Sequence, residues 1–105
     1  MPQFSVYRNP NRDTAADYPL LLDVQSDLIA GLATLVVVPL CSALSMGQKC
    51  FKVLTPVFDV AGEQYIMLTP QLAGIPKNLV GPKVADLTHC RDEIIAALDL
   101  LITGI

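Results

Sequence analysis

The fold class is indicated by two short apolar runs, LLLDVQ at residues 20–25 and LVVV at residues 35–38. The second run is rich in β-branched valine and ends at Pro39. Continuous apolar runs of this length are typical of strands that are buried on both faces of a sheet. We therefore expect both runs to be central strands of a β-sheet.

Shorter strands are predicted near the margins of this sheet. Residues 4–7 have the composition of a strand and precede a turn-forming segment, residues 9–13, rich in Asn, Pro and Asp. Pro76 and Pro82 interrupt a later segment, because proline cannot donate a hydrogen bond to a β-ladder. That later segment is expected to form a loop and one short edge strand.

A hairpin is predicted in the middle of the chain. Two strand-like runs, residues 51–54 and 57–60, lead into Ala61–Glu63, and residues 64–69 follow. Apolar runs separated by a short glycine-containing segment are typical of an antiparallel hairpin. We expect sequential pairing here.

The end of the chain changes to a helical period. Its apolar side chains recur at spacings of three and four: Leu87, Cys90, Ile94, Leu98, Leu101 and Ile102. This spacing predicts one amphipathic helix from about Thr88 to Ile102. Asp86 or Thr88 can cap its start, and Gly104 can end it in the left-handed conformation. Many short strands followed by one helix predict a small, strongly bent β-barrel or two-sheet fold.

Length and composition indicate one domain, residues 1–105, that associates with itself. A typical domain has roughly 100–150 residues, which leaves no room for a second core. Hydrophobic residues make up 52% of the chain and charged residues 16%, so we expect an apolar partner surface and a homodimer. Seven Lys and Arg against ten Asp and Glu give a net charge of −3, which disfavours direct nucleic-acid binding.

The sequence predicts a cytoplasmic location. Residues 1–5 have neither the basic region nor the apolar region of a secretory signal. The longest apolar stretches, residues 35–41 and 94–102, are far shorter than the ~20 residues that a membrane span needs. We therefore expect no membrane association.

Signatures of metal sites and of most enzymes are absent from the sequence. The three cysteines, Cys41, Cys50 and Cys90, include no C-x-x-C pair, which favours reduced thiols over a disulfide or a zinc site. The chain has one histidine, His89, and no H-x-x-x-H, G-x-S-x-G or phosphate-binding glycine loop. We expect no cofactor and no metal, and most enzyme classes lack their sequence signature here.

One catalytic alternative stays open. Arg8, Arg12 and Asp13 cluster in the first loop. In a metal-free ribonuclease, arginine can stabilise phosphorane charge while an acid moves protons. A plain solvated turn would contain the same residues.

The order of several segments resembles a known family. The segments that carry the resemblance are Gln3–Tyr7, Leu22–Leu28, Val38–Leu40, Met67–Thr69, Val84–Leu87, His89 and Ile102–Ile105. The most specific parts are the motif D-V-Q-S-D at residues 23–27 and the terminal Gly-Ile. Together these segments resemble the CcdB family of bacterial toxins over nearly the whole chain.

This resemblance implies a fold and a function. The fold is a small SH3-like barrel with a side sheet and a C-terminal helix, as in the MazF and Kid ribonuclease toxins, assembled as a cytosolic homodimer. The function is that of a non-enzymatic toxin that binds the A subunit of DNA gyrase and traps the cleaved-DNA complex. A CcdA-type antitoxin neutralises the toxin and represses their operon together with it. DNA binding belongs to the antitoxin.

The resemblance also implies site residues. The gyrase-contacting positions follow the second strand or lie at the end of the helix: Ser26, Leu28, Asp99, Thr103, Gly104 and Ile105. The antitoxin-contacting positions lie in the first loop, at Arg8, Asn9, Arg12 and Asp13, and in the segment from Leu44 to Lys52.

Two of these positions depart from the best-known members of the family. Those members carry tryptophan before the terminal Gly-Ile, whereas this chain has Thr103 and no tryptophan. Asp99 replaces an amide and adds a negative charge to the contact surface. Two alternatives therefore remain beside the gyrase poison: a fold-sharing ribonuclease, and an inactive relative that only binds antitoxin.

Overall fold

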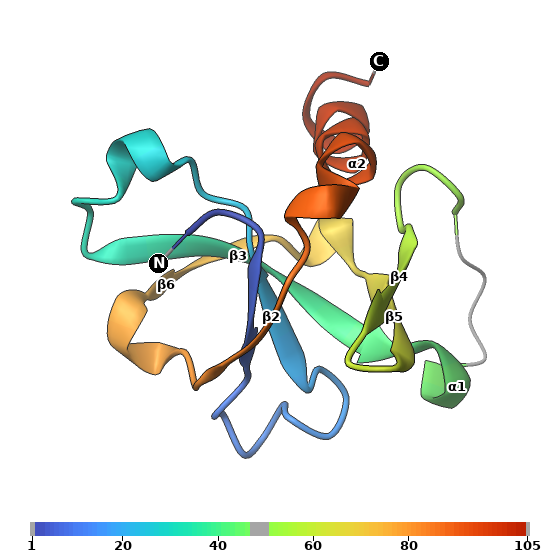
Figure 1. The fold of residues 1–105 in the computed structure, drawn as a ribbon, viewed down its shortest axis with the longest axis horizontal. Helices are drawn as coiled ribbons and strands as arrows, with labels where there is room; N and C mark the ends of the chain where they lie inside the picture. Colours follow the sequence, from blue (N-terminus) through green and yellow to red (C-terminus); the bar gives the residue numbers. More distant parts are fainter. Residues whose placement is uncertain (1, 47–50, 105) are drawn as a thin grey trace.

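The computed structural model describes residues 2–46 and 51–104, and Figure 1 shows their arrangement. The strands are β1 (Ser5–Arg8), β2 (Leu20–Asp23), β3 (Thr34–Ser42), β4 (Val57–Val60), β5 (Glu63–Met67), β6 (Ala73–Pro76) and β7 (Lys83–Asp86). The α-helices are α1 (Ala43–Met46) and α2 (Arg91–Thr103). Four short 3-10 helices connect them: η1 (Asp27–Ile29), η2 (Thr69–Gln71), η3 (Lys77–Leu79) and η4 (Thr88–Cys90).

The strands form one curled antiparallel sheet. Its strand order is β4-β5-β3-β2-β1-β7, and β6 pairs with the first half of β3. The curled sheet forms a half-barrel, and α2 stands beside it as the C-terminal helix (Figure 1). The expected mainly-β fold with one C-terminal helix is confirmed. In the described ranges, no helix is long and apolar enough to cross a bilayer.

Strand β3 is longer than the sequence predicted. It continues through Pro39, which was expected to end it. On one side, β3 pairs with β6 as far as Val37 and with β5 from Leu40 onward, so Pro39 lies between two partners. The carbonyl of Pro39 accepts a hydrogen bond from the N–H of Leu68 at 3.0 Å. Because no ladder bond needs an N–H at this point, proline does not interrupt the strand.

The hairpin prediction is confirmed, but its flanks differ. β4 and β5 are joined by Ala61 and Gly62, with φ of 52° and 86°, which is typical of a type I′ turn. Residues 51–54 form a turn rather than a strand. The proline-interrupted segment supplies two strands, β6 and β7, where one was predicted.

The main core lies between the curled sheet and α2. Val6, Leu22 and Leu40 from the sheet are fully buried with Ile94 and Ala97 from α2. A second, smaller cluster on the other face of the sheet contains Leu21, Leu35 and Val37. The two predicted apolar runs therefore bury side chains on both faces, as expected for central strands.

The predicted C-terminal helix is confirmed, but α2 begins at Arg91 rather than Thr88, because residues 88–90 form η4. Asp86 accepts a hydrogen bond from the N–H of Thr88 at 2.7 Å, but neither Asp86 nor Thr88 caps α2, whose N-cap residue Cys90 makes no side-chain capping bond. Gly104 ends the helix with φ of 74°, as expected. Ile102, placed on the buried face by its spacing, is 71% exposed. It lies about 80° around the helix from Ile94, and the last turn extends beyond the sheet (Figure 1).

Candidate functional site

The turn after β2 presents apolar side chains to solvent. Ser26 caps η1, since its hydroxyl accepts a hydrogen bond from the N–H of Leu28 at 3.1 Å. Leu28 is 95% exposed, and Ile29 and Leu32 in the same loop are about half exposed. Several apolar side chains exposed on one loop are typical of a contact surface.

Buried polar side chains hold this turn in place. The side-chain oxygen of Gln25 accepts a hydrogen bond from the N–H of Val36 at 3.1 Å, and its nitrogen donates to the carbonyl of Ile29 at 3.2 Å. The backbone N–H of Gln3 donates to the carboxylate of Asp27 at 2.8 Å. The exposed turn is therefore tied to β3 and to the N-terminal segment.

The buried carboxylate of Asp23 also stabilises this turn. Its Oδ1 accepts a hydrogen bond from the N–H of Gln25 at 2.9 Å, and the side chain is fully buried. Its Oδ2, like the hydroxyl of Ser5, has no hydrogen-bond partner in the described ranges. Burial raises the pKa of Asp23 to about 6, and the nearby charge of Asp27 acts in the same direction.

Sequence reasoning missed Gln25 and Asp23 as supports of the turn. It identified the motif at residues 23–27 as family-specific without assigning a role to these two side chains. The available signal was a charged residue inside an apolar run, followed two positions later by an amide. Buried polar groups require hydrogen-bond partners, so such residues are expected to hold local backbone.

The end of α2 forms the second predicted group. Asp99, Thr103 and Gly104 are all exposed. The hydroxyl of Thr103 donates to the carbonyl of Asp99 at 2.7 Å, which places both residues on one face of the helix. Ile102 exposes an apolar side chain beside them. Ile105 lies outside the described residues.

Within one chain, the turn after β2 and the end of α2 lie apart and do not form one surface. In Figure 1, η1 (cyan) and the end of α2 (red) both lie in the upper half of the molecule, at separate positions. A target that contacts both groups must therefore span part of the surface, or receive the groups from different copies of the chain.

The first loop contains one structural residue and three exposed charges. Asn9 uses its side-chain nitrogen to donate to the hydroxyl of Thr14 at 2.9 Å, so its amide stabilises the loop. Arg8, Arg12 and Asp13 are exposed, and none forms an ion pair within residues 2–46 and 51–104. Arg8 is the last residue of β1, and Arg12 and Asp13 lie in the loop that follows it.

The second predicted antitoxin segment is described only in part. Residues 47–50 lie outside the described ranges. On either side of them, Leu44 is 95% exposed and Phe51 is 63% exposed. These two side chains make the flanks of the segment apolar.

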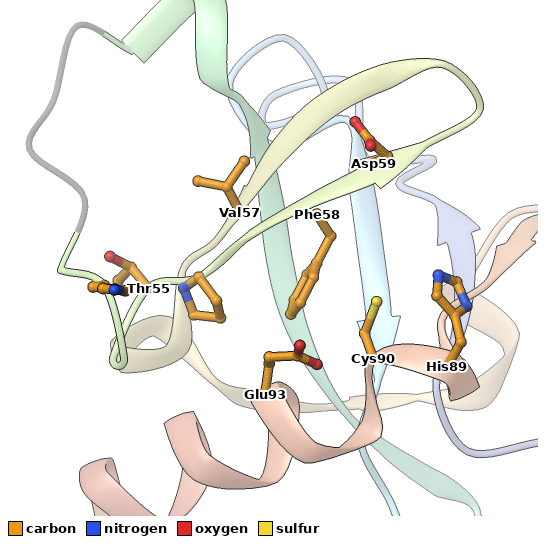
Figure 2. A pocket seen from close by; sticks show the side chains of 9 residues that line it. Thr55, Val57, Phe58, Asp59, His89, Cys90 and Glu93 are labelled. Atoms are coloured by element: carbon orange, nitrogen blue, oxygen red, sulfur yellow. The ribbon is translucent and has the colours of Figure 1, made fainter.

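A cavity lies elsewhere, between β4 and the segment that leads into α2. It has a volume of about 620 Å³ and is lined by Lys52, Thr55, Pro56, Val57, Phe58, Asp59, His89, Cys90 and Glu93. Figure 2 shows Phe58 pointing from the strand toward the helix, with Cys90 and Glu93 facing it. Burial raises the pKa of the Cys90 thiol, and the charges of Glu93 and Asp59 add to this effect. In the described part of the chain, no cluster of three His, Cys, Asp or Glu side chains is arranged to hold a metal.

Comparison with known protein families identifies a match over nearly the whole chain. The model of the family described as CcdB protein matches residues 3–104. The match includes the turn after β2, the first loop and α2 through Gly104. The curled antiparallel sheet and the C-terminal helix agree with this family's fold. The chain belongs to the CcdB family, the toxins of toxin–antitoxin systems.

Proposed function

We propose that this protein is a non-enzymatic toxin that binds the A subunit of DNA gyrase and traps the complex in which DNA is cleaved. The observation that carries the proposal is Leu28, almost fully exposed on a turn that buried side chains hold in one position. Because the backbone of the turn is already held, a partner that contacts Leu28 does not need to order the loop. The family match makes gyrase the favoured target.

The end of α2 supplies the second part of the proposed contact surface. Thr103 has a small side chain whose hydroxyl donates within its own helix, so it presents little apolar area in place of an aromatic ring. Ile102, 71% exposed, offers the apolar area at this end of the helix. We assign the main apolar contact here to Ile102, with Asp99, Thr103, Gly104 and Ile105 around it.

The partners follow from the same proposal. A homodimer presents two copies of each contact group, which suits a target that is itself twofold symmetric. A CcdA-type antitoxin neutralises the toxin through the loop with Arg8, Arg12 and Asp13 and through the apolar flanks at Leu44 and Phe51. Because the chain has a net charge of −3, operon DNA is contacted through the antitoxin. The site of action is the cytoplasm, where gyrase acts on DNA.

The test is a gyrase cleavage assay with purified protein, supercoiled plasmid and ATP. After treatment with detergent and protease, trapped cleavage complexes release linear DNA. We expect linear DNA from the wild type and none from a variant that lacks residues 102–105, which include Ile102. Cleavage of RNA without gyrase would contradict the proposal and support a ribonuclease. A folded dimer with neither activity would identify an inactive relative.

A further inference from the structure

Strand β4 is an open edge of the sheet. It stands at the end of the strand order and pairs, in the described ranges, with β5 alone. Val60 and Glu63 close the hairpin, and the N–H of Met67 donates to the carbonyl of Pro56 at 2.9 Å. Because backbone groups alternate in direction along a strand, those of Val57 and Asp59 point away from β5. This edge offers donors and acceptors to another strand.

The cavity of about 620 Å³ lies along this edge. Residues 55–59 form one wall, and His89 and Cys90 of η4 with Glu93 of α2 form the other. Figure 2 shows the strand above the helix, with Phe58 and Cys90 turned into the space between them. An unpaired strand edge with a helix beside it provides both a backbone ladder and a pocket for side chains.

The charges around the cavity indicate what would fit. Asp59 on the strand and Glu93 on the helix are both exposed, while Lys52 contributes one positive charge. The two carboxylates favour a basic side chain on the entering strand, and Phe58 with Cys90 favours an apolar one. A second copy of this chain is less suitable, because it has a net charge of −3 and would bring the same two acids.

We propose that the groove between β4 and α2 binds an extended peptide segment of a second protein, which adds a strand to the edge of β4. The backbone of the peptide pairs with Val57 and Asp59. One apolar side chain of the peptide enters between Phe58 and Cys90, and a basic side chain lies near Asp59 and Glu93. This inference does not depend on gyrase binding, because none of the residues expected to contact gyrase lines the groove.

The test uses an octapeptide of alternating valine and lysine with blocked termini. Binding is followed by amide resonances and by hydrogen exchange of the full-length protein. We expect the Val57 and Asp59 amides to gain protection, since the peptide would accept their hydrogen bonds. The same peptide with N-methylated backbone amides should not bind, and an alternating valine and glutamate peptide should bind more weakly.

Charge variants locate the site. Asp59→Asn and Glu93→Gln should each weaken binding about two- to five-fold, the range for an exposed ion pair. Asp92→Asn, on the same helix but outside the groove, should leave binding unchanged. Equal weakening by Asp92→Asn, equal binding of the N-methylated peptide, or unprotected Val57 and Asp59 amides would each overturn the proposal.

A further variant distinguishes a second copy as the occupant. Val57→Pro removes an outward N–H and leaves the bonds to β5 intact, because those belong to alternate residues. It should abolish peptide binding without changing the oligomeric state. If Val57→Pro instead dissociates a dimer, the edge belongs to a second copy of the chain and the proposal is wrong. Should this variant fail to fold, the two charge variants still decide the result.

Discussion

Gln25 and Val36 lie eleven positions apart, yet the side-chain oxygen of Gln25 accepts a hydrogen bond from the N–H of Val36 at 3.1 Å. The same side chain donates to the carbonyl of Ile29 at 3.2 Å and is 6% exposed. One buried amide thus joins a central strand to the exposed turn that carries Leu28.

Gln25→Met should therefore destabilise the fold and loosen the turn. It leaves the N–H of Val36 and the carbonyl of Ile29 without their partner, at a cost of about 1–3 kcal/mol in the free energy of unfolding. Gln25→Glu keeps the acceptor for Val36 but sets a carboxylate oxygen against the carbonyl of Ile29 and buries a charge, so it should lose at least as much at neutral pH. Urea denaturation and amide exchange at residues 26–29 measure both effects. Gln64→Met, at an exposed position of β5, is the control and should change stability by less than about 0.5 kcal/mol.

Asp23→Asn should stabilise the protein at neutral pH. The pKa of Asp23 is raised to about 6 in the fold, above the ~3.9 of an unfolded chain. Between these values the folded state binds more protons, so this group lowers stability as pH rises from about 4 to 6. Asparagine keeps the acceptor for Gln25 and removes the buried charge. Because each pKa unit is worth about 1.4 kcal/mol, the gain should grow by up to about 3 kcal/mol between pH 4 and pH 7.

To isolate this effect, the denaturant midpoints of the wild type and of Asp23→Asn are measured at several pH values, and their difference is taken at each pH. Other groups titrate equally in both proteins and cancel. A difference that stays constant from pH 4 to 7 would show that the Asp23 carboxyl has an ordinary pKa.

Leu28→Ser should weaken gyrase binding and leave the fold unchanged. The side chain is 95% exposed, so its removal costs no buried apolar area. At an interface the loss is on the order of 1–2 kcal/mol, or about ten-fold in Kd. Surface plasmon resonance with the gyrase A subunit measures Kd, and thermal unfolding measures Tm. Leu79→Ser, at another exposed leucine, is the matched control and should keep wild-type affinity.

Replacing each of two isoleucines of α2 by alanine should have different effects, one on stability and the other on gyrase binding. Ile94 is fully buried beneath the sheet, and Ile94→Ala should cost about 2–5 kcal/mol of stability. Ile102→Ala, eight positions later and 71% exposed, should cost almost none but weaken gyrase binding. Chemical denaturation and the cleavage assay distinguish these outcomes. Comparable loss of stability in both variants would mean that the last turn packs against a surface, such as a second copy.

Gly81→Ala should destabilise the first loop. A Cβ at this position would lie 2.8 Å from the backbone carbonyl oxygen of Arg8, which accepts a hydrogen bond from the N–H of Gly81 at 2.8 Å. Relieving this clash requires a backbone shift that costs about 1–3 kcal/mol. Gly74→Ala is the control, because its Cβ would meet nothing within 4 Å. If both variants unfold at the same urea concentration, the backbone at Gly81 has room to move.

Local patterns predicted the elements whose causes are local. The α2 helix followed from the spacing of apolar residues and from Gly104, and the β4–β5 hairpin followed from its glycine-containing turn. The passage of β3 through Pro39 could not be predicted this way. It depends on where β5 and β6 stop, which is set by pairing between distant parts of the chain.

Only part of the candidate site could be predicted from the sequence. The resemblance named the exposed positions Leu28 and Thr103, whose exposure agrees with a contact surface. The resemblance did not predict the role of Gln25 in holding the turn. Its hydrogen bond to the N–H of Val36 forms only after β2 and β3 have paired. Spacing alone also failed to identify Ile102 as exposed, because the sheet beneath α2 ends before the helix does.

Because α2 follows all the described strands in the sequence, the toxin can complete its fold only late in synthesis. Ile94 and Ala97 complete the main core, and they follow every strand in the sequence. A nascent chain that has not yet reached α2 keeps an open apolar sheet face. Native toxin therefore forms only once α2 has been synthesised, so a chain that ends before α2 should not reach the native fold.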